Sequence, residues 1–273
     1  MKMSCLPVSL FEEMINGNMS IKQWANAAKG IGLDGIDVSM AFFKSHTPSY
    51  LSTLKADIHQ VGMPIVMATT YPDFTHPEAL QRKREMDYLK RDIALCSELN
   101  ISFLRVLAGQ AHPQMGREQG TALAIQGLRE SAQTADEYGV KLLYENHAKP
   151  GAWHHTDFSY PPEIFLDIYE GIMNTGIGIN FDTGNPVAFG VNPLPLLKTV
   201  LPDVETIHVS DMKQYGTFEP TLIGTGVVPL KEIFTYLKAN RYDKWLCIEE
   251  ASFTGMAGIQ KAVDCVRETW QHA

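Results

Sequence analysis

Four side chains that can bind a metal ion stand at regular intervals in the second half of the chain: Glu145, Asp182, His208 and Glu249. Each ends a short apolar segment, and their spacing averages about 35 residues, the length of one strand-helix unit in a parallel α/β fold. The carboxyl ends of parallel strands meet at one edge, so these side chains are expected to converge. Three unpaired carboxylates in an apolar site would repel one another at a cost of several kcal/mol, and a cation between them removes that repulsion.

The donor set suits a divalent cation. Three carboxylates and one imidazole form a hard-to-borderline site, which accepts Mn²⁺, Mg²⁺, Co²⁺ or Zn²⁺ without choosing among them. The alternative is that each acid caps a helix or pairs with a surface lysine, which is the usual role of a single Asp or Glu. The repetition at four matching strand ends favours the metal site.

The choice between Glu249 and Glu250 follows from strand geometry, because successive side chains face opposite sides of a sheet. If Glu249 faces the interior, the aliphatic residues Leu246 and Ile248 face the helices that surround a barrel. This phase assigns Glu249 to the metal site and Glu250 to a neighbouring loop.

The elements that position these residues are predicted from stop signals and periodicity. Ser20 and Gln23 have the spacing of a capping box, and Ile21, Trp24, Ala25 and Ala28 then lie on one helix face. Amphipathic patterns predict further helices near 50–60, 77–98, 118–138, 161–173, 193–201, 229–239 and 257–271. Apolar runs predict strands at Cys5–Ser9, Ile36–Val38, Ile65–Thr69, Ile101–Val106, Val140–Tyr144, Ile177–Phe181, Val204–Val209 and Trp245–Ile248.

This alternation of strands and helices predicts the fold class. Eight strand-helix units over 273 residues, with no linker between them, fit a single-domain (β/α)₈ TIM barrel across residues 1–273 better than an open sheet. A dinucleotide fold is disfavoured because Gly30, Gly32 and Gly35 precede a strand and do not connect a strand to a helix.

The strand ends also carry a resemblance to a known family. They read Tyr-Glu-Asn-His at 144–147, Phe-Asp-Thr-Gly-Asn at 181–185, Ile-His-Val-Ser-Asp at 207–211 and Cys-Ile-Glu-Glu at 247–250. With Gly-Thr-Gly at 224–226, they resemble the xylose isomerase-like superfamily, and within it the sugar phosphate isomerase/epimerase group. That group is related to ketose 3-epimerases, inosose dehydratases and type IV apurinic endonucleases.

The resemblance implies that Glu145, Asp182, His208 and Glu249 bind one divalent metal and that the two glutamates also transfer protons. The implied activity is isomerisation or epimerisation of a sugar or sugar phosphate, and the alternative is dehydration of a keto-polyol. Two departures concern the substrate more than the metal: Asn185 replaces a histidine of many relatives, and Thr225 replaces a glutamate. A non-catalytic sugar-binding protein is disfavoured, because binding alone does not require two carboxylates beside a metal.

Five residues are candidates for substrate binding: His147, Asn185, Trp153, Arg105 and Lys213. Each has an ordinary structural alternative. His147 could cap a helix, Arg105 could form a buried ion pair with a neighbouring acid, and Lys213 could be a solvated lysine. Trp153 lies in a loop where its ring could cover a sugar face or simply pack.

Composition limits the partners. The formal net charge of −8 offers no basic surface for nucleic acid, and the extra ligands that the endonucleases need are missing, so a small sugar or keto-polyol is the expected partner. The absence of a long apolar run predicts no membrane segment and a cytoplasmic protein. Cys5, Cys96, Cys247 and Cys265 form no paired motif and are expected to be buried, reduced thiols. The sequence leaves open whether the chain forms a homo-oligomer.

Overall fold

The computed structural model describes residues 1–273, and its eight parallel strands alternate with helices as a TIM barrel, as the sequence predicts. In the sheet the strands follow the order β1-β8-β7-β6-β5-β4-β3-β2. Their bounds are β1 Lys2–Leu6, β2 Ile36–Ser39, β3 Ile65–Thr69, β4 Phe103–Val106, β5 Lys141–Glu145, β6 Gly178–Asp182, β7 Val204–Val209 and β8 Trp245–Glu249.

The helices are α1 Phe11–Ile15, α2 Ile21–Gly30, α3 Pro48–Val61, α4 Ala79–Glu98, α5 Arg117–Glu137, α6 Pro162–Ile172, α7 Asn185–Phe189, α8 Pro193–Val200, α9 Leu230–Ala239 and α10 Gly255–Gln271. Short 3₁₀ helices cover Val8–Leu10, Met40–Phe42 and Leu201–Asp203. None of the helices combines the length and the apolar composition that crossing a membrane requires.

Two sequence-based predictions need correction, and two short helices add to the predicted elements. The predicted strand Cys5–Ser9 is wrong in position: β1 ends at Leu6, and the chain turns at Pro7 into a 3₁₀ helix. The five-residue helices α1 and α7 were not predicted, because one turn and a half is too short to show a helical period. Cys265 is only partly buried, whereas the other three cysteines are buried as expected.

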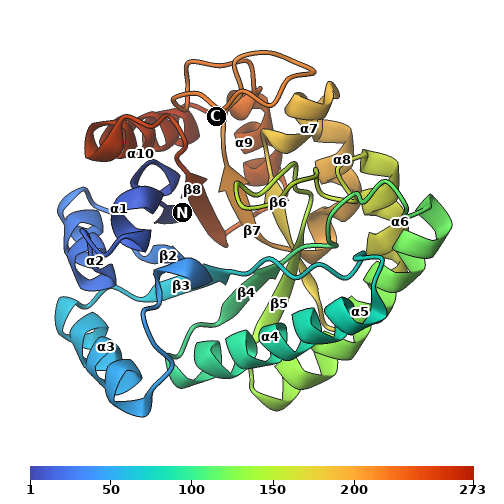
Figure 1. The fold of residues 1–273 in the computed structure, drawn as a ribbon. Coiled ribbons are helices and arrows are strands. Elements are labelled where there is room, and N and C mark those ends of the chain that lie inside the picture. Colours follow the sequence, from blue (N-terminus) through green and yellow to red (C-terminus); the bar gives the residue numbers. More distant parts are fainter. The chain divides into compact units, whose positions relative to one another are not determined.

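The chain divides into two compact units, which are described separately: residues 1–66 with 181–273, and residues 67–180. In the first unit β8 pairs with both β1 and β7, and Figure 1 labels β7 and β8. Cys247 of β8 lies opposite Ser4 of β1 and opposite His208 of β7. Since partners in register share a face and residues two apart do too, His208 and Glu249 point to the same side.

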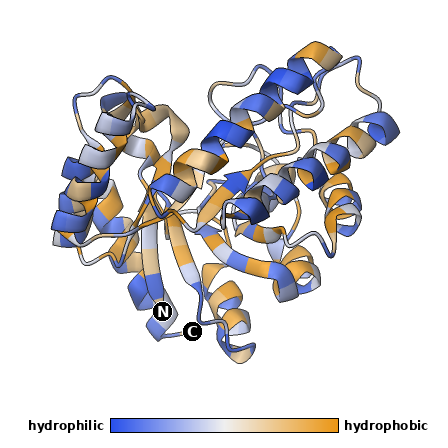
Figure 2. Cartoon of the chain, turned by 90° about the horizontal axis from the view of Figure 1, so that it is seen from below, coloured by the Kyte–Doolittle hydropathy of each residue, from blue (hydrophilic) through white to orange (hydrophobic).

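The core of the first unit lies between its strands and helices. Trp24 of α2, Val38 of β2 and Phe234 of α9 are fully buried. The helices of the chain carry hydrophobic and hydrophilic residues on different faces (Figure 2). At the start of α2, Ser20 accepts a hydrogen bond from the Gln23 backbone N–H, and the Gln23 side chain accepts one from the Ser20 N–H, which confirms the predicted capping box.

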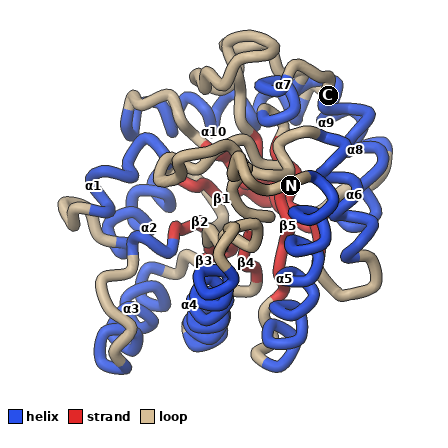
Figure 3. Tube along the Cα trace, turned by 45° about the vertical axis from the view of Figure 1, so that its right-hand side comes forward, coloured by secondary structure: helices blue, strands red, loops and turns tan.

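In the second unit, β3, β4 and β5 pair in parallel, and β5 pairs with the Gly178–Asn180 part of β6. Helices α4, α5 and α6, which are labelled in Figure 3, fall within the residues of this unit. Arg105 lies opposite Leu143, and Glu145 lies opposite Asn180, so the register places Arg105, Glu145 and Asn180 on one face. On the other face, the ring of Tyr144 stacks on Phe165 of α6 at 5.1 Å between centroids.

Loss of the cap at the start of α2 should weaken the fold measurably. Ser20→Ala removes the side-chain acceptor of the Gln23 N–H, and we expect the free energy of unfolding to fall by about 1 kcal/mol. Urea unfolding followed by circular dichroism measures this. Ser52→Ala, at an exposed position inside α3, is the control and should cost less than Ser20→Ala.

Candidate active site

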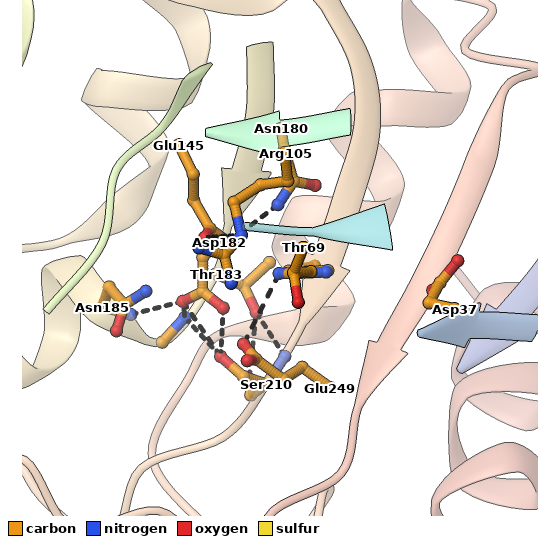
Figure 4. Close-up of polar contacts among 12 residues, drawn as sticks. Asp37, Thr69, Arg105, Glu145, Asn180, Asp182, Thr183, Asn185, Ser210 and Glu249 are labelled. Atoms are coloured by element: carbon orange, nitrogen blue, oxygen red, sulfur yellow. Dashed lines mark hydrogen bonds and ion pairs between the residues drawn. The ribbon is translucent and has the colours of Figure 1, made fainter. Parts of the chain in front are cut away.

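In the first unit, the carboxylate of Asp182 is held in one orientation at the end of β6. Its Oδ1 accepts hydrogen bonds from the backbone N–H groups of Gly184 at 2.8 Å and Asn185 at 2.6 Å. The Ser210 hydroxyl lies 3.0 Å from Oδ1 and 2.9 Å from Oδ2 (Figure 4). All of these residues are buried, so the carboxylate has a fixed position before any ligand arrives.

Ser210 is itself fixed by Thr183. The Ser210 N–H donates to Thr183 Oγ1 at 3.0 Å, and the Thr183 hydroxyl donates to the Ser210 carbonyl at 2.9 Å. Sequence reasoning gave Ser210 no role. The available signal was its place two residues after His208, which predicts the same side if the strand geometry continues.

His208 and Glu249 complete the part of the site that lies in the first unit. His208 is fully buried, and its Nδ1 lies 3.5 Å from Oε2 of Glu249, whose side chain is 17% exposed. Cys247 lies on the same strand face, and burial raises the pKa of its thiol well above the usual value, so the thiol stays neutral. Glu250 instead accepts a hydrogen bond from the Ser252 N–H, which agrees with the predicted phase of β8.

In the second unit, two side chains hold Glu145. Arg105 Nε lies 3.1 Å from Oε2, and the Asn180 side-chain amide donates to Oε1 at 2.7 Å. Arg105 and Glu145 are both buried. The structure shows the buried ion pair that the sequence allows for Arg105 (Figure 4), while a contact of Arg105 with a substrate stays a prediction.

The four residues that the sequence singles out offer a set of donor atoms in one place. One ligand atom from each of Glu145, Asp182, His208 and Glu249 lies within 4.8 Å of all the others. Three of these residues are buried. The donor types fit a divalent cation, because carboxylates and imidazole bind Mn²⁺, Co²⁺ and Zn²⁺ and a cation would offset the mutual repulsion of the carboxylates.

The remaining substrate candidates differ in accessibility. His147, Trp153 and Asn185 are between 5% and 9% exposed. The side chain of Lys213 is 63% exposed, and its Nζ lies 4.0 Å from Oε2 of Glu219. These features are typical of a solvated lysine. Their contact with a substrate stays a prediction.

Sequence reasoning missed a network of three loops in the second unit. Asp73, after β3, accepts hydrogen bonds from His112 Nε2 at 2.8 Å and from the side chain of Gln110 at 3.0 Å. Gln110, after β4, accepts one from the backbone N–H of His154, after β5, at 3.0 Å. A sequence shows no periodic signal for such contacts, because each residue lies in a loop and its partners are about 35 residues or more away.

Asp211 organises the loop that follows β7. Its carboxylate accepts hydrogen bonds from the backbone N–H groups of Met212, Gly224, Gly226 and Val228 at 2.8–3.1 Å. Burial raises the pKa of this carboxyl, and the four N–H groups oppose that rise. A Cβ at Gly226 would lie 2.2 Å from the Met212 carbonyl oxygen, so the loop requires glycine there.

Asp157 anchors the loop between β5 and α6. Its Oδ1 accepts hydrogen bonds from the N–H and the hydroxyl of Ser159, both at 2.7 Å, and its N–H donates to the Ala148 carbonyl. Burial raises the pKa of Asp157 to about 8, although the two hydrogen bonds from Ser159 oppose the rise. The carboxyl is therefore largely protonated at neutral pH.

Comparison with known proteins gives a family for the chain. Residues 25–269 match the family described as xylose isomerase-like TIM barrel. Among curated proteins, an inosose dehydratase from Bacillus thuringiensis (strain Al Hakam) is 27% identical over 178 residues, which cover 57% of this chain and 56% of the relative. The chain thus spans about half the length of the curated relatives it matches.

Two solved structures have the same fold. A D-tagatose 3-epimerase-like protein aligns with a TM-score of 0.82 and 19% identity, covering 100% of this chain and 98% of that one. The IolI protein with a bound zinc atom also aligns with a TM-score of 0.82, at 17% identity and with 100% and 99% coverage. At these identities the likeness establishes the fold alone.

The buried carboxyl of Asp157 should make stability depend on pH. The folded protein keeps this proton up to about pH 8, whereas an unfolded chain loses it near pH 4, so stability from this group falls as pH rises between those values. Asp157→Asn has no proton to lose. Between pH 4 and pH 8, we expect the free energy of unfolding of the variant to rise by at least about 1 kcal/mol relative to that of wild type.

Urea unfolding at both pH values measures this gain. The control is Asp167→Asn, whose side chain is 47% exposed and pairs with Arg117 at the surface. Equal pH dependence of Asp157→Asn and wild type would show that Asp157 is ionised in the folded protein.

Proposed function

Because the chain belongs to the xylose isomerase-like TIM barrel family, we propose that it is a divalent-metal-dependent sugar or sugar phosphate isomerase or epimerase. The observation that carries this proposal is the set of four ligand atoms within 4.8 Å of one another. A protein that only binds sugars has no need for two glutamates in such a set. The proposed reaction is a proton transfer at the carbon beside a ketose carbonyl.

Glu145, Asp182, His208 and Glu249 would hold the ion. A divalent ion bound there acts as a Lewis acid, which polarises the carbonyl and makes the neighbouring C–H more acidic. The zinc atom in the structure of the IolI protein supports a divalent ion, and Mn²⁺, Mg²⁺ and Co²⁺ suit the same donors.

Glu145 and Glu249 are the proposed acid and base. Glu249 is partly exposed and can face a substrate, while Glu145 is oriented by Arg105 and Asn180. Return of the proton to the opposite face of the same carbon epimerises the substrate, and its return to the adjacent carbon isomerises it. His147, Trp153, Asn185 and Lys213 are proposed to contact the substrate hydroxyls or, for Lys213, a phosphate.

A second candidate is a dehydratase that acts on a keto-polyol. It is favoured by the curated relatives, which are named inosose dehydratase. In this reaction the same proton is removed, and a hydroxyl on the next carbon leaves with a proton as water. The two candidates differ in product: an isomerase or epimerase conserves the composition of the substrate, whereas a dehydratase forms a product lighter by one water.

The metal site predicts retention of an ion after purification. We expect about one divalent ion per chain, because the four donor atoms lie within 4.8 Å of one another. Asp182→Ala and His208→Ala each remove a donor and should abolish retention, as measured by elemental analysis of the dialysed protein. Asp136→Ala, at an exposed position of α5, is the control. Retention by both donor variants at the wild-type level would contradict the site.

Proton transfer can be separated from metal binding by a second pair of variants. Glu145→Gln and Glu249→Gln keep an oxygen ligand but lose the basic carboxylate, so each should lower kcat by about 10²–10⁴-fold. The metal content of each variant should fall by a smaller factor than kcat. The assay uses a panel of ketoses and keto-polyols in D₂O, with mass spectrometry to follow deuterium uptake and loss of water.

The control for these substitutions is Glu118→Gln, at an exposed position in the first turn of α5, which should leave turnover unchanged. If both glutamine variants turn over substrate at the wild-type rate, the two glutamates act only as metal ligands. The proposed proton transfer is then wrong, even if both variants keep the metal ion.

A further inference from the structure

Arg105 is a buried charge beside a proposed metal ligand. Its side chain is 1% exposed, and its Nε lies 3.1 Å from Oε2 of Glu145, which is itself fully buried. An arginine keeps its positive charge at any pH at which proteins are folded. Arg105 therefore offsets the negative charge of Glu145 permanently, with or without a metal ion.

Other contacts within the second unit fix Arg105 in place. Its Nη1 donates a hydrogen bond to the Thr70 carbonyl at 3.3 Å, and its Cζ lies 4.8 Å above the centroid of the Tyr71 ring. The Tyr71 hydroxyl in turn lies 3.1 Å from Thr69 Oγ1. A backbone carbonyl and the face of an aromatic ring both contact the guanidinium. The positive charge therefore has a defined position relative to Glu145.

This pairing determines the net charge that a metal ion meets. The donor set has three carboxylates, Glu145, Asp182 and Glu249, and one imidazole, His208, which binds a metal ion in its neutral form. Because Arg105 offsets Glu145, the negative charge that the ion meets is lower by one than the three carboxylates alone supply. Attraction between the ion and its site grows with the charge of the ion, so this loss of negative charge weakens the binding of a trivalent ion more than that of a divalent ion.

We infer that Arg105 is a positioning residue that holds Glu145 and, as its fixed countercharge, makes the site select divalent over trivalent ions. This inference rests on the proposed metal site. Arg105 affects the preference of the site for the charge of the ion. The four donors themselves determine the ligand type and the preferred ion size. Without Arg105 the negative charge that the ion meets rises by one, which favours a trivalent ion more than a divalent ion.

The test measures the affinities of Mn²⁺ and Lu³⁺, two ions of similar radius, by isothermal titration calorimetry in a slightly acidic buffer without phosphate. The quantity of interest is the ratio of the two dissociation constants. A distorted ligand geometry weakens the binding of both ions, so its effect largely cancels in the ratio of the two dissociation constants. The effect of a missing positive charge does not cancel, because Coulomb energy scales with the charge of the ion.

Arg105→Met should change the ratio of the two dissociation constants by at least about tenfold in favour of Lu³⁺ binding, relative to wild type. Arg105→Lys keeps the charge and should leave the ratio within about threefold of wild type, even if both ions bind more weakly. Arg117→Met removes an exposed arginine that pairs with Asp167 and is the control for a general change in protein charge.

A double variant protects the test against loss of folding. Arg105→Met leaves Glu145 buried without its countercharge, which could prevent folding. In a Glu145→Gln background that problem does not arise, so adding Arg105→Met to Glu145→Gln should produce the same shift of at least about tenfold. The double variant removes one positive and one negative charge, and its ratio should return close to that of wild type.

The outcomes separate this inference from the proposed function. If wild type binds Mn²⁺ and removal of Arg105 leaves the ratio unchanged in both backgrounds, the inference is wrong and the metal site stands. If Arg105→Lys shifts the ratio as much as Arg105→Met, geometry and not charge sets the preference, which also overturns it. If wild type binds neither ion, the proposed metal site fails, and the inference fails with it.

Discussion

The candidate site depends on one electrostatic constraint, the need to keep carboxylates ionised and oriented where little water can reach them. The protein meets it differently for each acid. Asp182 is held by two backbone N–H groups and the Ser210 hydroxyl, and Glu145 is held by a guanidinium and an amide. Glu249 keeps partial exposure. Fixed partners suit a carboxylate that acts as a ligand, and partial exposure suits one that also meets a substrate.

A related arrangement recurs in the loops, where a buried carboxyl group accepts several hydrogen bonds and so fixes a segment that has no regular hydrogen bonding of its own. Asp211 does this for the loop after β7, Asp73 for the loops after β3 and β4, and Asp157 for the loop after β5. Asp157 does so with a raised pKa. Loop order in this protein is thus tied to carboxyl groups.

The two reactions proposed for this chain can share a first chemical step and still give different products. A dehydratase expels a hydroxyl from its substrate, and an epimerase does not. Removal of a proton beside a carbonyl can begin either reaction, and groups around the substrate select the outcome. Substrate-facing loops, and not the four proposed metal ligands, are where an epimerase and a dehydratase on this fold are expected to differ.

The sequence by itself determined the alternation of strands and helices, the capping box at Ser20 and the spacing of the four proposed ligands, because these follow from local periodicity and from the common direction of parallel strands. The tertiary structure alone decided the partners. Ser210 on Asp182, Arg105 on Glu145 and Gln110 on Asp73 join residues about 28 to 40 positions apart, which no local pattern encodes. Arg105 shows this most directly: an ion pair with a neighbouring acid was one role that its sequence position allowed, and only the register of β4 and β5, which places it beside Glu145, identifies the partner.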